Sequence, residues 1–138
     1  MSAALEVAAV EAANTAFYTA VEHADGAAMA RVWDEERPAD VTCVHPGWPA
    51  LRGRGPVLRS WSAVMAGTDY IHFLLTDVAV AVDGDTAVVS CTENVLSGQS
   101  GGGGAGAATA TNVFRRRADG WRLQVHHASP LLPGVTGE

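Results

Sequence analysis

The sequence contains no lysine, so its nine basic residues are all arginine. Fifteen aspartate and glutamate residues outnumber them, and the formal net charge is -6 at pH 7. Proteins that bind nucleic acid or anionic membrane surfaces do so through an excess of positive charge. The shortage of positive charge therefore argues against both kinds of partner.

Cysteine and long apolar runs are also scarce. The two cysteines, Cys43 and Cys91, fall in separate predicted strands and not in the spaced pairs of a disulfide framework. No apolar run approaches the length that a membrane span needs. The first residues lack the basic stretch and apolar run of a secretion signal. We therefore expect a cytoplasmic protein whose two thiols are reduced and buried.

What the sequence does contain is typical of one globular domain. Hydrophobic residues make up 48% and charged residues 17% of its 138 positions, enough for a single core. We expect one domain over residues 1–138, with a loose C-terminal tail from about residue 130. Helical periodicity and breaking residues predict three helices, over 3–23, over 25–33 and from Pro56 onward. Strands are predicted over 41–45, 70–82, 86–97, 107–117 and 121–129.

The connections between the predicted strands indicate how the sheet is built. The segments Asp83-Gly84-Asp85 and Ala118-Asp119-Gly120 are typical of hairpin turns. The glycine-rich stretch 99–106 lacks the helix and lysine of a phosphate-binding loop, so we expect a flexible hairpin tip there. Helices followed by hairpin-linked strands predict an α+β fold, with three helices on one face of a mostly antiparallel sheet.

Polar residues interrupt the apolar rows of three predicted strands. Alternate residues of a strand share a face, which places His45 beside Cys43 and Glu93 beside Cys91. The last strand carries a row that begins apolar and ends polar: Trp121, Leu123, Val125, His127 and Ser129. By this alternation His127 points inward and His126 points away.

A carboxylate buried among apolar groups is costly unless it is paired or protonated. We therefore hypothesise that His127, Glu93 and His45 meet as an acid–base set, with His127 transferring the proton and Glu93 as its charge partner or the base. His45 and Asn112 would orient a substrate oxygen. The hypothesis fails if Glu93 and His127 lie on opposite faces of the sheet.

The partner of Asn112 depends on the last hairpin. A two-residue Asp119-Gly120 loop places Asn112 opposite His127, whereas a three-residue loop with a bulge at Gly120 places it opposite His126. Periodicity leaves both alternatives open.

Further residues are candidates for binding a ligand: Trp48, Trp61, His72 and Ser129. Trp48 follows His45 in a loop, as a lid over a pocket or as a packing plug, and Trp61 covers the core from a helix. His72 either lines the pocket or faces solvent. Adjacent histidines on a strand point to opposite faces and cannot chelate one metal. A site for iron made of two histidines and Glu93 is conceivable, but we expect neither a metal nor another cofactor.

The order of these elements and several local segments resemble the nuclear transport factor 2-like superfamily, particularly its SnoaL-like branch. The segments are Phe17-Tyr18, Asp25-Gly26, 44–48, Gly53-Arg54, 111–116, 120–122 and 127–129. The last strand is also similar to that of the calcium/calmodulin-dependent kinase II association domain, where a Trp opens the strand and a His and Ser close it. The resemblance spans residues 5 to 130.

The resemblance implies a cone in which a curved sheet encloses a deep apolar pocket, and dimers built through the sheet. It does not fix the function, because this fold hosts isomerases, dehydratases, hydrolases and non-catalytic association domains. We predict a protein that binds a compact, mostly apolar organic molecule. If it is an enzyme, the expected class is acid–base chemistry without a cofactor. The alternative is a non-catalytic ligand-binding or association domain.

Overall fold

A computed structural model describes residues 2–99 and 102–132. Within these residues the α-helices are α1 (Ala3–Glu22), α2 (Gly26–Val32) and α3 (Arg54–Ala66), and Pro38–Asp40 form a short 3-10 turn. The strands are β1 (Thr42–Val44), β2 (Leu51–Arg52), β3 (Tyr70–Asp83), β4 (Thr86–Gln99), β5 (Gly102–Arg117) and β6 (Gly120–Pro130). The predicted helices and strands are all present, and the two-residue strand β2 is an addition.

Local sequence signals explain where the helices begin. The Ser2 hydroxyl accepts a hydrogen bond from the Leu5 backbone N–H at 3.2 Å and caps α1. Asp25 caps α2 in the same way through Ala28 N–H, at 3.0 Å. Helix α3 begins at Arg54, two residues before the expected Pro56, because Gly53 at a φ of 96° turns the chain into the helix.

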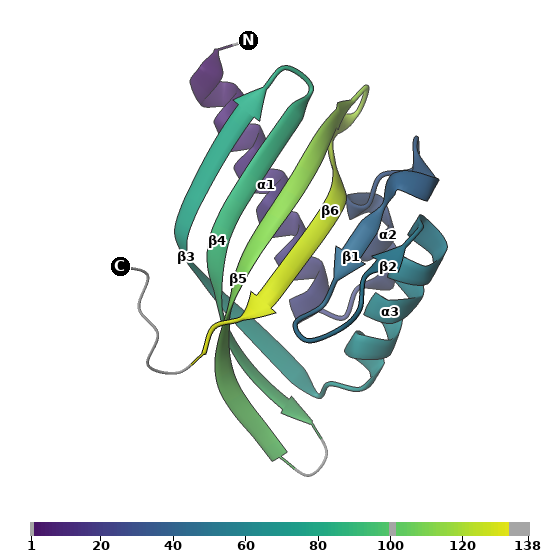
Figure 1. The fold of residues 1–138 in the computed structure, drawn as a ribbon, viewed down its shortest axis with the longest axis vertical. Coiled ribbons are helices and arrows are strands. Elements are labelled where there is room, and N and C mark those ends of the chain that lie inside the picture. The colour runs from purple at the N-terminus through teal and green to yellow at the C-terminus, as the bar shows by residue number, and fades with distance from the viewer. Residues whose placement is uncertain (1, 100–101, 133–138) are drawn as a thin grey trace.

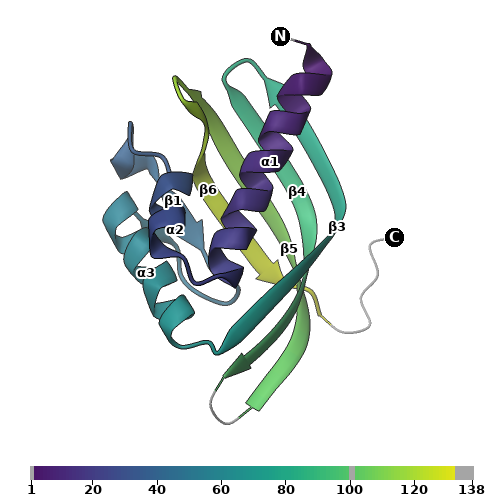
Figure 2. The same ribbon diagram turned by 180° about the vertical axis from the view of Figure 1, so that it is seen from behind.

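The strands form a single sheet in the order β2-β1-β6-β5-β4-β3. Every neighbouring pair is antiparallel except β1 and β6, which run parallel. The curved sheet lies in front in Figure 1, and Figure 2 shows the three helices together on its other side. This is the predicted α+β architecture, and the sheet does not close into a barrel.

The core lies between α1 and the concave face of the sheet. Its largest fully buried side chains include Trp33, Phe17, Phe114, Met29 and Leu123. The Phe17 ring packs edge-on against Trp61, with ring centroids 5.2 Å apart. Burial of such aromatic and aliphatic surface is the main favourable contribution to folding. No helix in the described part of the chain is long and apolar enough to cross a membrane.

The predicted hairpin tip over residues 99–106 is shorter than expected, because the described residues of this stretch are paired in the sheet. Strand β5 begins at Gly102, and β4 and β5 stay paired as far as Gln99 opposite Gly102. An antiparallel ladder needs only backbone N–H and C=O groups, so glycine can take part in it. The turn residues 100 and 101 lie outside the described residues.

The first two residues of the predicted tail, Pro130 and Leu131, are held by the sheet. Pro130 is the last residue of β6, and the Leu131 N–H donates to the Ala107 carbonyl at 2.8 Å. Residues 133–138, the rest of the predicted tail, lie outside the described residues.

Candidate functional site

A β-bulge at Gln124 sets which side chains of β6 point inward. Phe114 pairs with Leu123 and Val113 pairs with Val125, so Gln124 has no partner of its own on β5. One extra residue in a strand reverses the inward and outward alternation beyond it. The hairpin itself turns through two residues, 118 and 119, because Arg117 pairs with Gly120.

The prediction that His127 points inward is therefore wrong. His126 is 2% exposed and points into the core, whereas His127 and Ser129 are exposed on the other face. Glu93 is buried at 5% exposure, as its row predicted. Glu93 and His127 thus lie on opposite faces of the sheet, and the acid–base set cannot include His127. Asn112 lies opposite His126, one of the two alternatives that the hairpin left open, although the bulge is at Gln124 and not at Gly120.

Glu93 receives its hydrogen bond from helix α1. The Tyr18 hydroxyl donates to Glu93 Oε2 at 2.6 Å. Burial raises the pKa of the Glu93 carboxyl, and the hydrogen bond from Tyr18 opposes that rise in part. Burial together with the negative charge of Glu93 raises the pKa of the Tyr18 hydroxyl well above its usual range, so Tyr18 remains a donor.

Asn112 links the two sides of this cluster. Its side-chain Nδ2 donates to Asn14 Oδ1 at 2.9 Å and to the Tyr18 hydroxyl at 3.1 Å. Its Oδ1 lies 2.6 Å from Nδ1 of His126. An amide oxygen only accepts, so His126 carries its proton on Nδ1 and leaves the Nε2 lone pair free.

The free Nε2 of His126 faces Glu93. The two atoms Nε2 and Oε2 are 3.9 Å apart, beyond direct hydrogen-bond distance. Burial lowers the pKa of His126 to about 3, so the imidazole is neutral near pH 7. A neutral imidazole with a free lone pair and a carboxyl of raised pKa therefore lie 3.9 Å apart in the interior.

His45 lies beside this pair, on the side of α3. It is 4% exposed, and its Nε2 lies 2.9 Å from Ser60 Oγ. Because Ser60 donates its own proton to the Val57 carbonyl at 2.7 Å, it accepts from His45. Burial lowers the pKa of His45.

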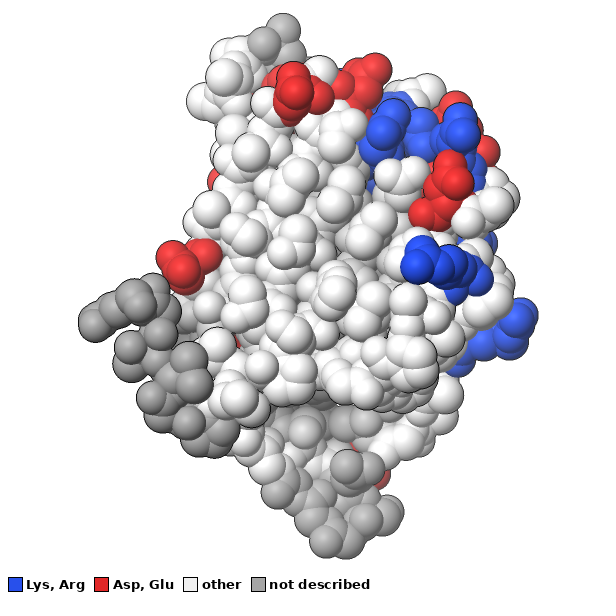
Figure 3. Space-filling view, viewed as in Figure 1, with Lys and Arg blue, Asp and Glu red and all other residues white. Residues whose placement is uncertain are grey.

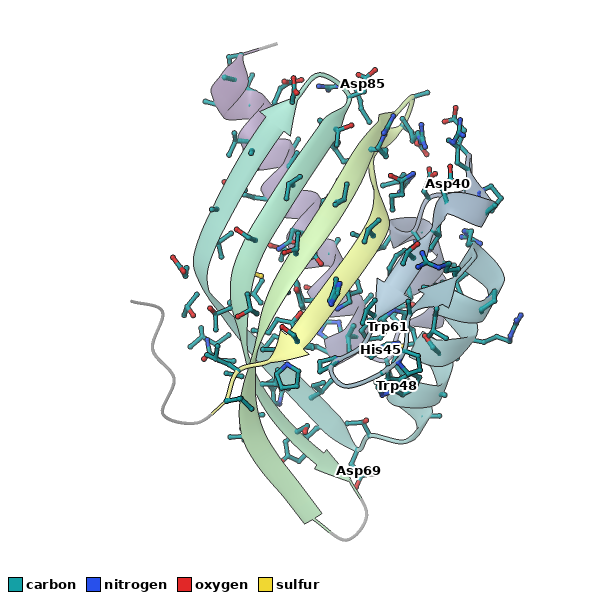
Figure 4. The ribbon with its side chains drawn as sticks, viewed as in Figure 1. Asp40, His45, Trp48, Trp61, Asp69 and Asp85 are labelled. Carbon is teal, nitrogen blue, oxygen red and sulfur yellow. The ribbon has the colours of Figure 1, made fainter. Side chains whose placement is uncertain are left out.

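Aromatic rings connect His45 to the surface and to the interior. Its ring centroid is 4.6 Å from that of Trp48 and 4.6 Å from that of Trp61, and Figure 4 shows the three side chains together. Trp48 is 46% exposed and lies over His45, while Trp61 is buried with its ring 5.8 Å from that of His126. The rings thus run from solvent to the Glu93–His126 pair.

The remaining predicted ligand-binding residue, His72, lies away from the cluster. It is exposed on β3 and lines an open groove of about 770 Å³ between β3, β4 and β5. Neither Glu93 nor His126 lines this groove. Both side chains of the Glu93–His126 pair are buried, at 5% and 2% exposure. Among residues 2–99 and 102–132, no three histidine, cysteine or acidic side chains gather as a metal site.

Sequence reasoning missed Tyr18, Asn14 and His126. A signal for the first two was present, since Asn14 and Tyr18 are one helical turn apart on the apolar face of α1 that contains Phe17. Polar groups at that spacing on a buried face indicate a partner in the core. His126 carried no such signal, because the bulge has no glycine or proline to mark it.

Residues 10–133 match the SnoaL-like domain family. A crystal structure of a candidate dehydratase of the NTF2-like family from Streptomyces avermitilis is 52% identical, with a TM-score of 0.89. The match covers 95% of this chain and 99% of that one. None of the curated proteins matches the chain.

Two further solved structures have the same fold. A candidate calcium/calmodulin-dependent protein kinase type II association domain from Thiobacillus denitrificans is 35% identical, with a TM-score of 0.77, over 88% of this chain and 94% of that one. A candidate aromatic ring hydroxylase from Novosphingobium aromaticivorans is 20% identical, with a TM-score of 0.84, over 96% and 94% of the two chains. At that identity the likeness concerns the fold alone. The family match over nearly the whole chain, the curved sheet and these relatives agree: the chain belongs to the SnoaL-like domain family of NTF2-like proteins.

Proposed function

We propose that this protein binds a small organic molecule inside the cone and removes water from it by acid–base chemistry, using Glu93 and His126. The observation that carries the proposal is the state of Glu93. It is 5% exposed, its one side-chain hydrogen bond among the described residues comes from Tyr18, and no cation contributes to its pKa shift. Buried carboxyls without a compensating charge are costly and concentrate at functional sites.

The pair can divide the two proton transfers of an elimination. The free Nε2 of neutral His126 takes a proton from carbon, and protonated Glu93 gives its proton to the hydroxyl group that leaves as water. The C–H electron pair forms the new double bond while the C–O bond breaks. His126 then holds one extra proton and Glu93 lacks one, and transfer across the 3.9 Å between Nε2 and Oε2 restores both groups.

The network around the pair supports these roles. Asn112 accepts from Nδ1–H of His126 and so holds the Nε2 lone pair toward the reacting carbon. Tyr18 fixes the Glu93 carboxyl and stays protonated. The 52% identical Streptomyces protein is described as a candidate dehydratase, in agreement with this reaction class.

A ligand would reach the buried Glu93–His126 pair by movement of the loop that carries Trp48. This loop follows β1, and Gly47 at its turn has a φ of 81°. Trp48 is the exposed end of the ring series that includes His45 and Trp61. Movement of the loop would open a route past Trp61 to His126 without disturbing the sheet.

The test is elimination of water from a small hydroxylated compound with an absorbing product. With 3-hydroxycyclohexanone, formation of 2-cyclohexen-1-one is followed by ultraviolet absorbance. We expect Glu93→Gln and His126→Gln each to reduce the rate by about 10² to 10⁴. His127→Gln is the matched control, because it changes the exposed neighbour, and it leaves the rate unchanged. Loss of the rate in His127→Gln with retention in His126→Gln contradicts the proposal.

A second candidate function is assembly through the outer face of the sheet. Large apolar side chains are exposed there, with Leu74 at 67% and Leu96 at 50%. Figure 3 shows a broad surface over the strands without charged side chains. The Thiobacillus relative is described as a candidate association domain. Exposed apolar patches of this kind mark protein interfaces.

We propose that this face forms a homodimer, with or without catalysis. Sedimentation of the protein at about 50 µM measures the oligomeric state. A dimer that Leu96→Arg converts to a monomer supports the assembly role, and a monomeric parent contradicts it. A dimer without turnover of any hydroxylated compound would leave assembly as the function in place of elimination.

A further inference from the structure

We infer that a second copy of this chain docks on the outer face of the sheet about a two-fold axis along β4, and that Arg115 of each copy pairs with the partner's Asp83. This alignment rests on the homodimer proposed above and adds the contacts that fix it. Strands β5 and β6 carry four neighbouring arginines. Three of them pair with a carboxylate of the same chain: Arg116, Arg117 and Arg122.

Arg115 differs from these three. Its guanidinium has no carboxylate partner among residues 2–99 and 102–132, and its buried Nε makes no hydrogen bond there. Its cross-strand neighbours are Thr86 and Arg122, neither of which carries a negative charge. A like charge directly opposite on the next strand is unfavourable. A carboxylate supplied by another molecule would therefore stabilise this end of the sheet.

The chain itself carries a suitable carboxylate in the same row of the sheet. Arg115 points to the outer face, because the adjacent Phe114 is buried in the core. Strand pairing places Asp83, Thr86 and Arg115 in one row across β3, β4 and β5. Asp83 is exposed, but two strand spacings of about 4.8 Å separate it from Arg115. Figure 3 shows acidic and basic side chains side by side at this end of the outer face.

A two-fold axis along the middle strand of that row brings the two charges together. In a symmetric dimer the same surface of both copies forms the interface. An axis parallel to β4 lays β3 of one copy over β5 of the other. Arg115 then faces the partner's Asp83, and the same contact forms a second time on the other side of the axis. The uncharged Thr86 lies at the axis, between the two ion pairs.

The apolar part of the face fits the same axis. Leu74 on β3 shares a row with Ala107 on β5, and His72 shares a row with Ala105. Large side chains on β3 thus have small side chains at the matching positions of β5. The axis places Leu74 over the partner's Ala107, in the open groove that these residues line. Leu96, which is 50% exposed on β4, meets its own counterpart at the axis.

Reversal of the two charges tests this alignment, with the dimer dissociation constant measured by sedimentation. Arg115→Asp and Asp83→Arg each place like charges at both contacts, so each should raise the dissociation constant at least about 100-fold. An equimolar mixture of the two variants should form a heterodimer about as tight as the parent dimer, because every reversed charge then meets its opposite. The double variant should dimerise with itself for the same reason.

Arg52→Asp is the matched control. It reverses an exposed arginine on β2, at the opposite edge of the same sheet, and leaves the dissociation constant unchanged. A parent dimer that both reversals leave intact overturns this alignment alone, and the homodimer stands. Failure of the mixture and of the double variant to dimerise also overturns it, because loss of the single variants then has a cause other than charge pairing. A monomeric parent overturns the homodimer and the alignment together.

Discussion

Asp34 and Glu93 are both buried carboxylates, but their surroundings differ. Asp34 is fully buried, and it accepts two hydrogen bonds of 2.8 Å from the Arg117 guanidinium and one of 3.1 Å from the Arg37 backbone. Glu93 has one hydrogen bond, from the neutral Tyr18 hydroxyl. The first carboxylate has a cation and a full set of donors, and the second has neither.

The pKa values move in opposite directions as a result. The hydrogen bond from Arg117 lowers the pKa of Asp34, whereas burial raises the pKa of Glu93. Asp34 follows Trp33 and connects that segment to the end of β5, so its charge serves the fold. Glu93 gains no such compensation, and the role in proton transfer proposed for it would account for its cost to stability. The comparison separates a buried charge that stabilises the fold from a buried carboxyl without a cation.

The largest expected effect comes from removing the cation of Asp34. Arg117→Met leaves a buried, uncompensated carboxylate and should lower the free energy of unfolding by about 3–5 kcal/mol. Urea denaturation at pH 7 measures it. Arg37→Met is the control, because that side chain pairs with Asp40 at the exposed surface, where removing an ion pair changes stability little. A similar small loss for Arg117→Met would place Asp34 in the same class as Glu93.

An intermediate effect concerns His126 and acid. Its pKa is depressed to about 3 from a usual 6.5, so its contribution to stability is present above pH 6.5 and is lost as the pH falls toward 3. The parent should lose up to about 1.4 kcal/mol per pH unit more than His126→Gln over that window. The lowered pKa of Asp34 contributes stability above the usual value of 3.8, so this contribution changes only when the pH falls below 3.8. Unfolding free energies at pH 7.5, 6 and 5 separate the contribution of His126, which changes over this range, from that of Asp34, which does not.

The contribution of Glu93 to the unfolding free energy changes with pH in the direction opposite to that of His126. Its pKa is raised, so its contribution is present below the usual 4.5 and is lost as the pH rises through the folded value. The His126 comparison is therefore repeated in a Glu93→Gln background. Parallel pH curves for the parent and His126→Gln in both backgrounds would show that His126 is not held neutral by burial.

The smallest effect is the stability change of Glu93→Gln itself. The amide keeps an acceptor for Tyr18 and removes a buried charge, so stability at pH 8 should be unchanged or about 1 kcal/mol higher. Asp34→Asn, the matched substitution, should be destabilising because it leaves Arg117 without its partner. Thermal unfolding of both variants gives the contrast, and a shared direction of change would remove the distinction between the two carboxylates.

Much of the fold followed from the sequence because its signals are local. Alternation placed Cys43, His45, Cys91 and Glu93 on inner faces, and all four are buried. The glycine-rich stretch misled because glycine has low strand propensity, whereas the β4–β5 ladder depends on backbone groups alone.

The candidate site was harder to predict because it depends on register and on tertiary contacts. A one-residue bulge at Gln124 reversed the assignment of the adjacent histidines, and no glycine or proline marks it. The contact between Tyr18 and Glu93 joins residues 75 positions apart. Periodicity within one element carries no information about such a pair.

The bulge in β6 decides which of the two adjacent histidines, His126 or His127, lies on the inner face. A shift of one residue in β6 exchanges the inner and outer positions beyond it. Because His126 and His127 follow each other, a single insertion or deletion near Gln124 would still bring one imidazole to the inner face. The doubled histidine therefore keeps an imidazole on the inner face after a one-residue shift that would remove it from a strand with a single histidine.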